Sequence, residues 1–177
     1  MRKLSMDELN RISVEEFKKT EKFPVVLILD NIRSLNNVGA AFRTADAFRI
    51  EKIYLCGITG KPPHRDIRKT ALGASESVTW QYYPTTLAAI DECKAAGYHI
   101  CAVEQAEGST SLEQLEIVKQ EKYAFIFGNE VFGVEDDALA QSDKCIEIPQ
   151  FGTKHSLNIS VSIGIVLWHY MNNILKK

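Results

Sequence analysis

The chain has 177 residues, of which 45% are hydrophobic, 25% are charged and 9% are aromatic, and its formal net charge is −2. This composition excludes a disordered chain, and the length suits one domain with a sizeable core. The small negative charge excludes a general polycation, so nucleic acid could bind only where basic side chains gather in a patch.

The N-terminus and the cysteines bear on the cellular compartment. Residues 1–20 are charged throughout, without a signal-peptide pattern, and no apolar run approaches the ~20 residues of a membrane-spanning helix. The four cysteines lack CxxC spacing and a histidine at zinc-ligand spacing, which favours buried free thiols. They are Cys56, Cys93, Cys101 and Cys145. We therefore expect a cytoplasmic protein with no membrane segment and no metal.

The first half of the chain alternates between helix and strand patterns. Residues 5–19 indicate an amphipathic helix with an apolar stripe of Leu9, Ile12 and Phe17. Asn36 and Asn37 are good helix caps. The other predicted elements are strands at 24–29, 52–56 and 78–82, helices at 38–48 and 66–72, and a loop at 60–65.

The second half continues this alternation. Its predicted strands lie at residues 99–103, 123–127 and 144–148, and its helices at 86–96, 112–118, 136–141 and 157–175, with a polar turn at 107–111. Alternating strands and helices predict an α/β fold with a mainly parallel sheet and helices on both faces. Without a repeat or a clear linker, we expect one domain over residues 1–177, with residues 1–22 as an N-terminal helical extension.

Residues 36–45 form the first unusual segment after a predicted strand. Gly39 and its neighbouring alanines would let a helix pack closely, and Arg43 lies on about the same side as Asn36 by i, i+7 spacing. An arginine there could bind phosphate through its planar fork. A capped helix whose arginine pairs with a carboxylate is the structural alternative.

The second segment is residues 127–134, in which Gly128 and Gly133 bracket Glu130 directly after a predicted buried strand. Such a loop lies at the carboxyl end of the sheet, where α/β proteins bind ligands. It is neither a P-loop nor a GxGxxG fingerprint. A strand-to-helix turn with a capping glutamate explains this loop nearly as well.

The third segment, residues 148–167, runs from a strand end through a polar stretch into a largely apolar helix. Ser156, Asn158, Ser160 and Ser162 lie where the polar stretch enters that helix. A helix start with small polar side chains offers N–H groups and room for a ligand. A buried helix with small residues for packing is the alternative.

Together these segments resemble the three motifs of the SpoU (TrmH-like) family of RNA ribose methyltransferases, within the SPOUT class. The first motif is similar to residues 37–44, the second to 128–134, and the third to 148–149, 152 and 156–160. They follow the family's order, and the resemblance spans about residues 25–167. It implies a homodimer and a trefoil knot in the C-terminal part of the fold, which periodicity alone could not reveal.

The same resemblance implies S-adenosylmethionine as methyl donor and a ribose 2′-hydroxyl of RNA as acceptor. tRNA is favoured over rRNA because compact members often act on tRNA. The family's catalytic positions correspond to Arg43, Asn37, Glu130, Ser156 and Asn158. Its donor-binding positions correspond to Gly128, Ile148 and Leu157, which would act through their backbone, with Glu104 as a candidate for the pocket wall.

Methyl transfer from a sulfonium depends mainly on positioning the acceptor and removing its proton. The resemblance gives Arg43 the activating role, although guanidinium is a very weak base. Either Arg43 loses its proton in a special pocket, or it holds a neighbouring phosphate that accepts the proton, and we favour the second. Glu130 could fix Arg43 through an ion pair, while Ser156 and Asn158 could hydrogen-bond the sugar or phosphate.

RNA binding requires cations, and five basic side chains follow the second predicted strand. They are Lys61, His64, Arg65, Arg68 and Lys69. These residues are a candidate RNA patch, with a solvated loop as the alternative. His64 and His155 are better interpreted as polar contacts than as metal ligands, since no ligand set surrounds either.

Three alternatives compete with a tRNA methyltransferase. One is an rRNA 2′-O-methyltransferase, and another is a non-catalytic RNA-binding relative that kept the fold. The five intact catalytic positions speak against the latter. A nucleotide- or NAD-binding α/β enzyme is the third, and the missing GxGxxG and P-loop patterns weigh against it.

Overall fold

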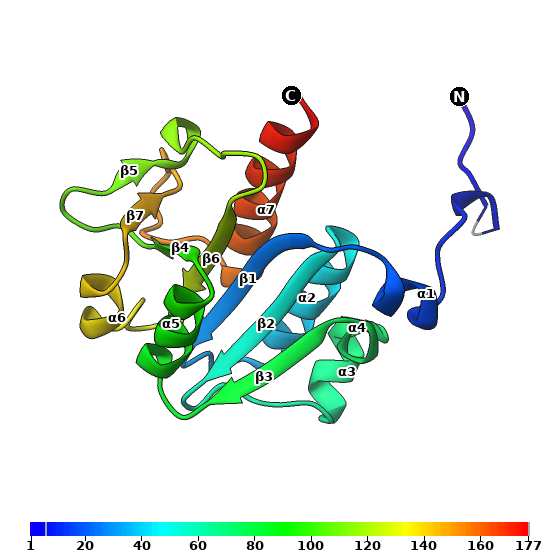
Figure 1. Ribbon diagram of the computed structural model, residues 1–177, viewed down its shortest axis with the longest axis horizontal. Coiled ribbons are helices and arrows are strands. Elements are labelled where there is room, and N and C mark those ends of the chain that lie inside the picture. The colour runs from blue at the N-terminus through cyan, green and yellow to red at the C-terminus, as the bar shows by residue number, and fades with distance from the viewer. Residues whose placement is uncertain (6, 177) are drawn as a thin grey trace.

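The computed structural model describes residues 1–5 and 7–176, which form one sheet with helices on both faces (Figure 1). The strands are β1 Phe23–Asp30, β2 Ile50–Cys56, β3 Thr79–Tyr83, β4 Tyr98–Val103, β5 Thr110–Ser111, β6 Lys122–Phe127 and β7 Lys144–Glu147. Over the described residues they pair in the order β3-β2-β1-β6-β4-β7-β5, and every pairing is parallel. The predicted α/β class with a parallel sheet is confirmed.

The helices divide between the two faces of this sheet. They are α1 Val14–Lys19, α2 Leu35–Ala47, α3 Arg65–Ala71, α4 Ala74–Ser77, α5 Thr86–Ala95, α6 Asp136–Ala140 and α7 Ile159–Leu175, with 3-10 turns η1 Asp7–Leu9 and η2 Leu112–Gln114. In β1, Leu27 and Leu29 pack toward α2 and α7, while Val26 and Ile28 pack toward α5. Burial on both faces explains the unbroken apolar run of β1.

Gly39 allows α2 and α3 to pack closely, as the sequence predicted. A Cβ atom at this position would lie 2.1 Å from Oγ1 of Thr70 and 2.3 Å from the carbonyl oxygen of Ile67. Thr70 also donates a 2.9 Å hydrogen bond to the carbonyl of Asn36. The small residue therefore fixes the contact between these helices.

The predicted helix over residues 5–19 is wrong in its extent. It is divided into η1 and α1, and Asn10 between them has a φ of 47°, which an α-helix does not accommodate. A capping box starts α1, in which Ser13 and Glu16 each accept a hydrogen bond from the other's backbone N–H. Of the expected apolar stripe, Phe17 is buried, whereas Leu9 and Ile12 are exposed.

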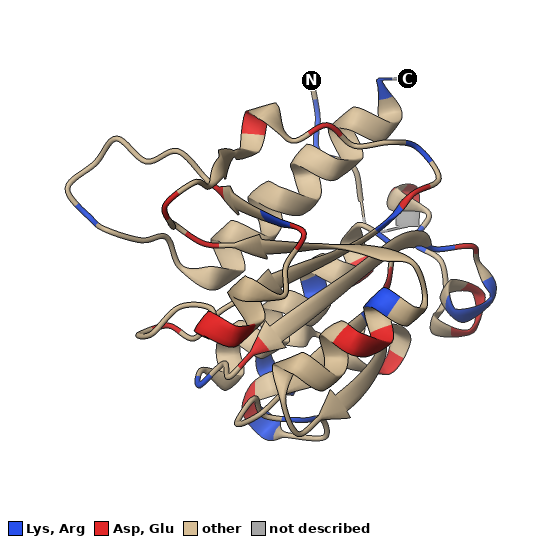
Figure 2. Cartoon of the chain, turned by 60° about the vertical axis from the view of Figure 1, so that its left-hand side comes forward, with Lys and Arg blue, Asp and Glu red and all other residues tan. Residues whose placement is uncertain are grey.

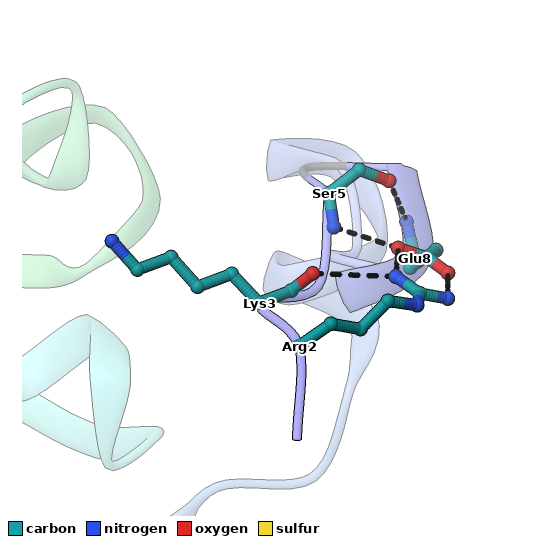
Figure 3. A network of polar contacts seen from close by, with 4 residues as sticks. All are labelled: Arg2, Lys3, Ser5 and Glu8. Carbon is teal, nitrogen blue, oxygen red and sulfur yellow. Dashed lines mark hydrogen bonds and ion pairs between the residues drawn. The ribbon is translucent and has the colours of Figure 1, made fainter.

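A polar network holds the chain before α1 (Figure 3). Arg2 forms a bidentate ion pair with Glu8, at 2.6 and 2.9 Å, and Glu8 also accepts a 2.7 Å hydrogen bond from the backbone N–H of Ser5. The Arg2 guanidinium, followed by the Ser5 N–H, lowers the pKa of Glu8 to about 2. Because the pair is exposed, it orders this segment locally and adds little to global stability.

Three further boundaries differ from the prediction. Ser34, rather than Asn36 or Asn37, caps α2 by accepting a hydrogen bond from the N–H of Asn37. The predicted turn at 107–111 contains β5, and the helix predicted at 112–118 is reduced to η2. The final helix begins at Ile159, with Asn158 as its N-cap. Tertiary contacts decide these ends, which local patterns place only approximately.

β7 lies between β4 and β5, although β4 and β5 precede it in the sequence. The chain leaves β4, reaches the sheet edge at β5 and returns to the interior at β6. Helix α7, which follows β7, contacts the segment between β5 and β6, since Nε2 of His169 lies 2.9 Å from the carbonyl oxygen of Leu115. The C-terminal part is thus built into the sheet rather than appended to it.

Two further sequence expectations concern the cysteines and membrane-spanning helices. The four cysteines are free thiols, as predicted; Cys56, Cys93 and Cys101 are buried, whereas Cys145 is only half-buried. Burial raises the pKa of each of these three thiols to about 12. Within residues 1–5 and 7–176, none of the helices has the length and apolar character to cross a membrane.

Candidate functional site

A cavity of about 750 Å³ opens at the carboxyl ends of β4, β6 and β7. Most of its lining comes from four segments, residues 103–106, 127–134, 147–148 and 155–159. The volume matches that of ligand pockets in proteins, and the carboxyl edge of a parallel sheet is where such pockets form. We call it the carboxyl-end cavity.

All four residues predicted to bind a cofactor line the carboxyl-end cavity. They are Glu104, Gly128, Ile148 and Leu157. The last three lie outside the helices and strands, and their backbone groups pair with no other described backbone group. The cavity wall therefore presents free N–H and C=O groups, which a ligand can use for hydrogen bonds.

Gly128 and Glu104 give the β6–α6 loop its shape. A Cβ atom on Gly128 would lie 2.1 Å from both the carbonyl carbon of Gly133 and the nitrogen of Val134. The Glu104 carboxylate accepts hydrogen bonds from the N–H groups of Val134, at 3.1 Å, and Gln105, at 2.8 Å. Glu104 thus holds two walls of the cavity together, which supports its predicted place in the pocket wall.

Glu130 joins the same loop to the start of α2. Its Oε1 accepts hydrogen bonds from the N–H of Ser34 and Nδ2 of Asn37, and its Oε2 accepts one from the N–H of Arg33, each at 3.0 Å. Desolvation raises the pKa of this carboxyl, but the donated hydrogen bonds outweigh it, and the net pKa is lowered. Glu130 therefore stays ionised and is a poor proton acceptor at neutral pH.

Asn37 and Asn158 continue this network into α7. Nδ2 of Asn158 donates to Oδ1 of Asn37 at 3.3 Å, and Oδ1 of Asn158 accepts hydrogen bonds from the N–H and hydroxyl of Ser160. Asn158 and Ser156 both line the carboxyl-end cavity. Four of the five predicted catalytic residues are thereby gathered at or beside one cavity.

Arg43 is the exception. Its side chain is exposed and makes no hydrogen bond or ion pair with any described residue, so Arg43 and Glu130 of one chain do not form the predicted ion pair. The physical reason is helix geometry, because six residues separate Arg43 from Asn37 and place them about 120° apart around α2. Arg43 is accordingly absent from the lining of the carboxyl-end cavity of its own chain.

The candidate RNA patch is exposed at all five positions, Lys61, His64, Arg65, Arg68 and Lys69. Nζ of Lys61 lies 3.9 Å from the ring centroid of Tyr82, and Nδ1 of His64 caps α3 by accepting a hydrogen bond from the N–H of Asp66. His64 is therefore a polar contact, as expected. In the view of Figure 2, basic and acidic residues are interspersed along the chain, so charge alone does not single out one binding surface.

Sequence reasoning missed Asn129 and Phe132. Oδ1 of Asn129 accepts hydrogen bonds from the N–H groups of Val131 and Phe132, and its Nδ2 donates to the carbonyl of Asn31 at 2.7 Å. This tight turn holds the Phe132 side chain, which is 85% exposed, at the cavity wall. An asparagine between a glycine and a turn is the signal that could have found this contact.

Comparison with known proteins shows the same fold and sequence family. The family described as "SpoU rRNA Methylase family" matches residues 24–168. A tRNA (guanosine(18)-2′-O)-methyltransferase of Thermus thermophilus is 28% identical over 169 residues, which cover 96% of this chain and 85% of that protein.

Two solved structures are similar at a TM-score of 0.80 and 25% identity. One is the A. aeolicus TrmH/SpoU tRNA modifying enzyme, with 92% of this chain and 81% of that chain covered. The other is an AdoMet-bound rRNA methyltransferase from Sinorhizobium meliloti, with 89% of this chain and 60% of that chain covered. The family match over residues 24–168, together with the shared fold, shows that this chain belongs to the SpoU rRNA methylase family.

Proposed function

We propose that the chain transfers a methyl group from S-adenosylmethionine to a ribose 2′-hydroxyl of RNA. The observation that carries this proposal is the carboxyl-end cavity, where the predicted donor-binding residues meet Ser156 and Asn158. Similarity to tRNA and rRNA methyltransferases, one of them bound to AdoMet, supports the same conclusion.

The cavity suits the methyl donor in both size and chemistry. Free backbone groups at Gly128, Ile148 and Leu157 can hydrogen-bond an adenosine moiety. Where Gly128 closely approaches Gly133, no side chain projects from Gly128 into the cavity wall. The bound donor would supply an electrophilic methyl group on sulfur. The protein's own task is to place the ribose oxygen in line with that methyl group.

In the proposed reaction the ribose oxygen forms a bond to the methyl carbon as the carbon–sulfur bond breaks, and the hydroxyl proton leaves. Glu130 is fully engaged in hydrogen bonds and has a lowered pKa, so it does not take this proton. We assign the proton to a phosphate of the RNA that Arg43 holds. Ser156 and Asn158 orient the sugar from the cavity wall.

A homodimer would bring Arg43 to this chemistry. Val161 and Trp168 on α7 are 48% and 58% exposed and lie on one side of the helix by i, i+7 spacing. α2 and α7 lie on the same face of the sheet (Figure 1), so a second copy packing there would meet both helices. We propose that Arg43 of one copy serves the carboxyl-end cavity of the other.

Several finer features remain part of the proposal. A trefoil knot, in which the C-terminal segment passes through a loop of residues 104–121, is part of this proposal. The position of β7 between β4 and β5 and the contact of His169 with Leu115 support it. Residues 1–22 form the N-terminal extension of a single catalytic domain.

The candidate RNA patch binds the acceptor RNA. The cytoplasm is the proposed location because such RNA is modified there.

tRNA is the proposed acceptor, with rRNA as the alternative. The Thermus thermophilus relative, which this chain covers over 85% of its length, is a tRNA methyltransferase, whereas the similar Sinorhizobium meliloti protein is an rRNA methyltransferase. The test is to incubate the protein with methyl-labelled donor and, separately, with tRNA and rRNA, and then to map the labelled nucleotide. Label in neither RNA would contradict the proposed reaction.

A non-catalytic RNA-binding relative is the competing function. It predicts RNA binding without donor binding, so calorimetric titration with S-adenosylmethionine separates the two. A saturable heat signal and a thermal shift that grows with donor concentration support the enzyme. Their absence at high donor concentration would favour the non-catalytic relative.

A further inference from the structure

A second cavity, of about 440 Å³, lies at the opposite end of the sheet from the carboxyl-end cavity. Its lining includes Lys22, Phe23, Arg49, Lys119 and Tyr170, and we call it the basic pocket. Lys22, Arg49 and Gln120 directly or closely precede β1, β2 and β6. β1 has eight residues, so the two cavities are separated by about 25 Å along the strands.

Three cations surround the basic pocket without an anionic partner. Lys22, Arg49 and Lys119 form no ion pair with a described residue, and Glu21, a carboxylate in the lining, pairs with none of them. Burial, followed by the neighbouring Arg49 charge, lowers the pKa of Lys22. The fold therefore brings like charges together on an acidic chain, at an electrostatic cost that a bound anion would relieve.

Two hydrogen-bond donors in this pocket also lack partners. Nε of Arg49 is buried and bonds to no described residue, while its guanidinium carbon lies 5.3 Å from the ring centroid of Phe23. Tyr170 is 1% exposed, and its hydroxyl makes no hydrogen bond with a described residue. Buried polar groups are normally satisfied, so the unpaired Nε of Arg49 beside a cavity indicates a ligand that accepts hydrogen bonds.

Lys22 fixes one side of the pocket. Its Nζ donates hydrogen bonds to the carbonyls of Phe17 and Thr20, the latter at 2.5 Å, which leaves one N–H free. Phe23, Tyr170 and Ile174 add apolar surface beside the cations. A tetrahedral oxyanion joined to a sugar matches this combination of donors and apolar wall, because arginine binds phosphate through its planar fork.

We propose that the basic pocket binds a backbone phosphate of the RNA whose target ribose lies at the carboxyl-end cavity. The inference rests on the proposed function in taking RNA as substrate, and it adds a contact about 25 Å from the chemistry along β1. An RNA chain that reaches both ends of the sheet would be held in register by this second contact.

Binding of a fluorescently labelled bulk tRNA fraction tests the proposal in the full chain. Lys119→Gln removes an exposed charge with no structural partner, and should weaken binding about threefold to tenfold and lower the salt slope by about 1. Tyr170→Phe removes only the unpaired hydroxyl and should weaken binding about twofold to fivefold. Lys144→Gln, an exposed lysine outside the pocket, is the matched control and should bind as wild type.

The outcomes separate this proposal from the proposed function. If wild type binds tRNA and methylates RNA while both pocket variants bind as wild type, the basic pocket is not an RNA contact and only this inference falls. If wild type binds no RNA, both the phosphate contact in the basic pocket and the proposed function are contradicted. A thermal shift by inorganic phosphate that Lys119→Gln abolishes, with RNA affinity unchanged, would assign the pocket to free phosphate and overturn the RNA contact.

Discussion

Asn158 donates a 3.3 Å hydrogen bond from Nδ2 to Oδ1 of Asn37, and so joins the N-cap of α7 to the first turn of α2. Nδ2 of Asn37 in turn donates to Glu130, which belongs to the β6–α6 loop. Three segments that are far apart in the sequence are thereby fixed around the carboxyl-end cavity. This relay makes the position of each segment depend on the other two.

Replacing Asn37 should disrupt that relay. Asn37→Ala removes two side-chain hydrogen bonds, so we expect a loss of about 1–2 kcal/mol in the free energy of unfolding and a marked fall in methyl transfer. Asn36→Ala is the matched control, since the Asn36 side chain is exposed and makes no hydrogen bond with a described residue. Urea unfolding and a labelled-donor assay measure both effects, and equal behaviour of the two variants would contradict the relay.

Arg43→Ala should abolish methyl transfer without destabilising the fold. Its side chain is exposed and has no partner in residues 1–5 and 7–176, so the stability change should stay within about 0.5 kcal/mol. Donor affinity, measured by calorimetry, should be unchanged because Arg43 does not line the carboxyl-end cavity of its own chain. Turnover retained near the wild-type rate would refute the role given to Arg43.

Gly128→Ala should damage donor binding. The added Cβ would lie 2.1 Å from backbone atoms of Gly133 and Val134, which cannot yield as a flexible side chain could, so the loop must move. We expect at least a tenfold loss of donor affinity by calorimetry. Gly164→Ala, where a Cβ also meets nothing within 4 Å, is the control, and a similar loss there would show that glycine content rather than packing matters.

The Glu130 carboxyl should make stability depend on pH. Its pKa is lowered in the folded chain, so its stabilising contribution is complete above the unfolded pKa of about 4.3 and is lost as pH falls through the folded pKa. Because Glu130 is exposed, this contribution should be about 1 kcal/mol or less. The difference in stability between wild type and Glu130→Gln, measured by urea unfolding, should be present at pH 6 and should shrink as the pH falls below about 4. A difference that stays constant with pH would contradict this origin.

The proposed homodimer predicts complementation between impaired variants. Arg43→Ala and Gly128→Ala should show more methyl transfer when unfolded together and refolded as a mixture than either variant alone, because one mixed site has both residues intact. The assay uses a donor concentration too low to saturate Gly128→Ala. Trp168→Glu places a charge on the exposed stripe of α7 and should give a monomer by light scattering. Failure of complementation by dimeric variants would place Arg43 at the cavity of its own chain.

The sequence predicted the cavity better than it predicted Arg43. Gly128, Ile148 and Glu104 follow strands, and the ends of parallel strands meet at one edge of a sheet, so their proximity follows from the fold class alone. For Arg43, spacing tells which turn of α2 it occupies, but the side of the helix that faces the cavity depends on how α2 packs against α3 and α7. That packing is a tertiary property.

Local patterns failed where a few residues outweighed a longer periodicity. The apolar spacing of residues 5–19 favoured one helix, yet the positive φ of Asn10 and the Ser13–Glu16 capping box divide it. The capping box could have been found from its Ser-x-x-Glu spacing. β5 has only two residues, too few for an alternating pattern, and it becomes a strand only because β7 lies beside it.

The place of β7 in the sheet also constrains how the protein can be made. On the ribosome, β4 and β5 emerge before β7, so the nascent chain carries an open strand edge on β4 until residues 144–147 have been synthesised. Open edges are sites of wrong pairing between chains. Faster synthesis, or synthesis at a high concentration of nascent chains, should therefore lower the yield of this protein. The loss should be larger than for a protein whose neighbouring strands are made one after another.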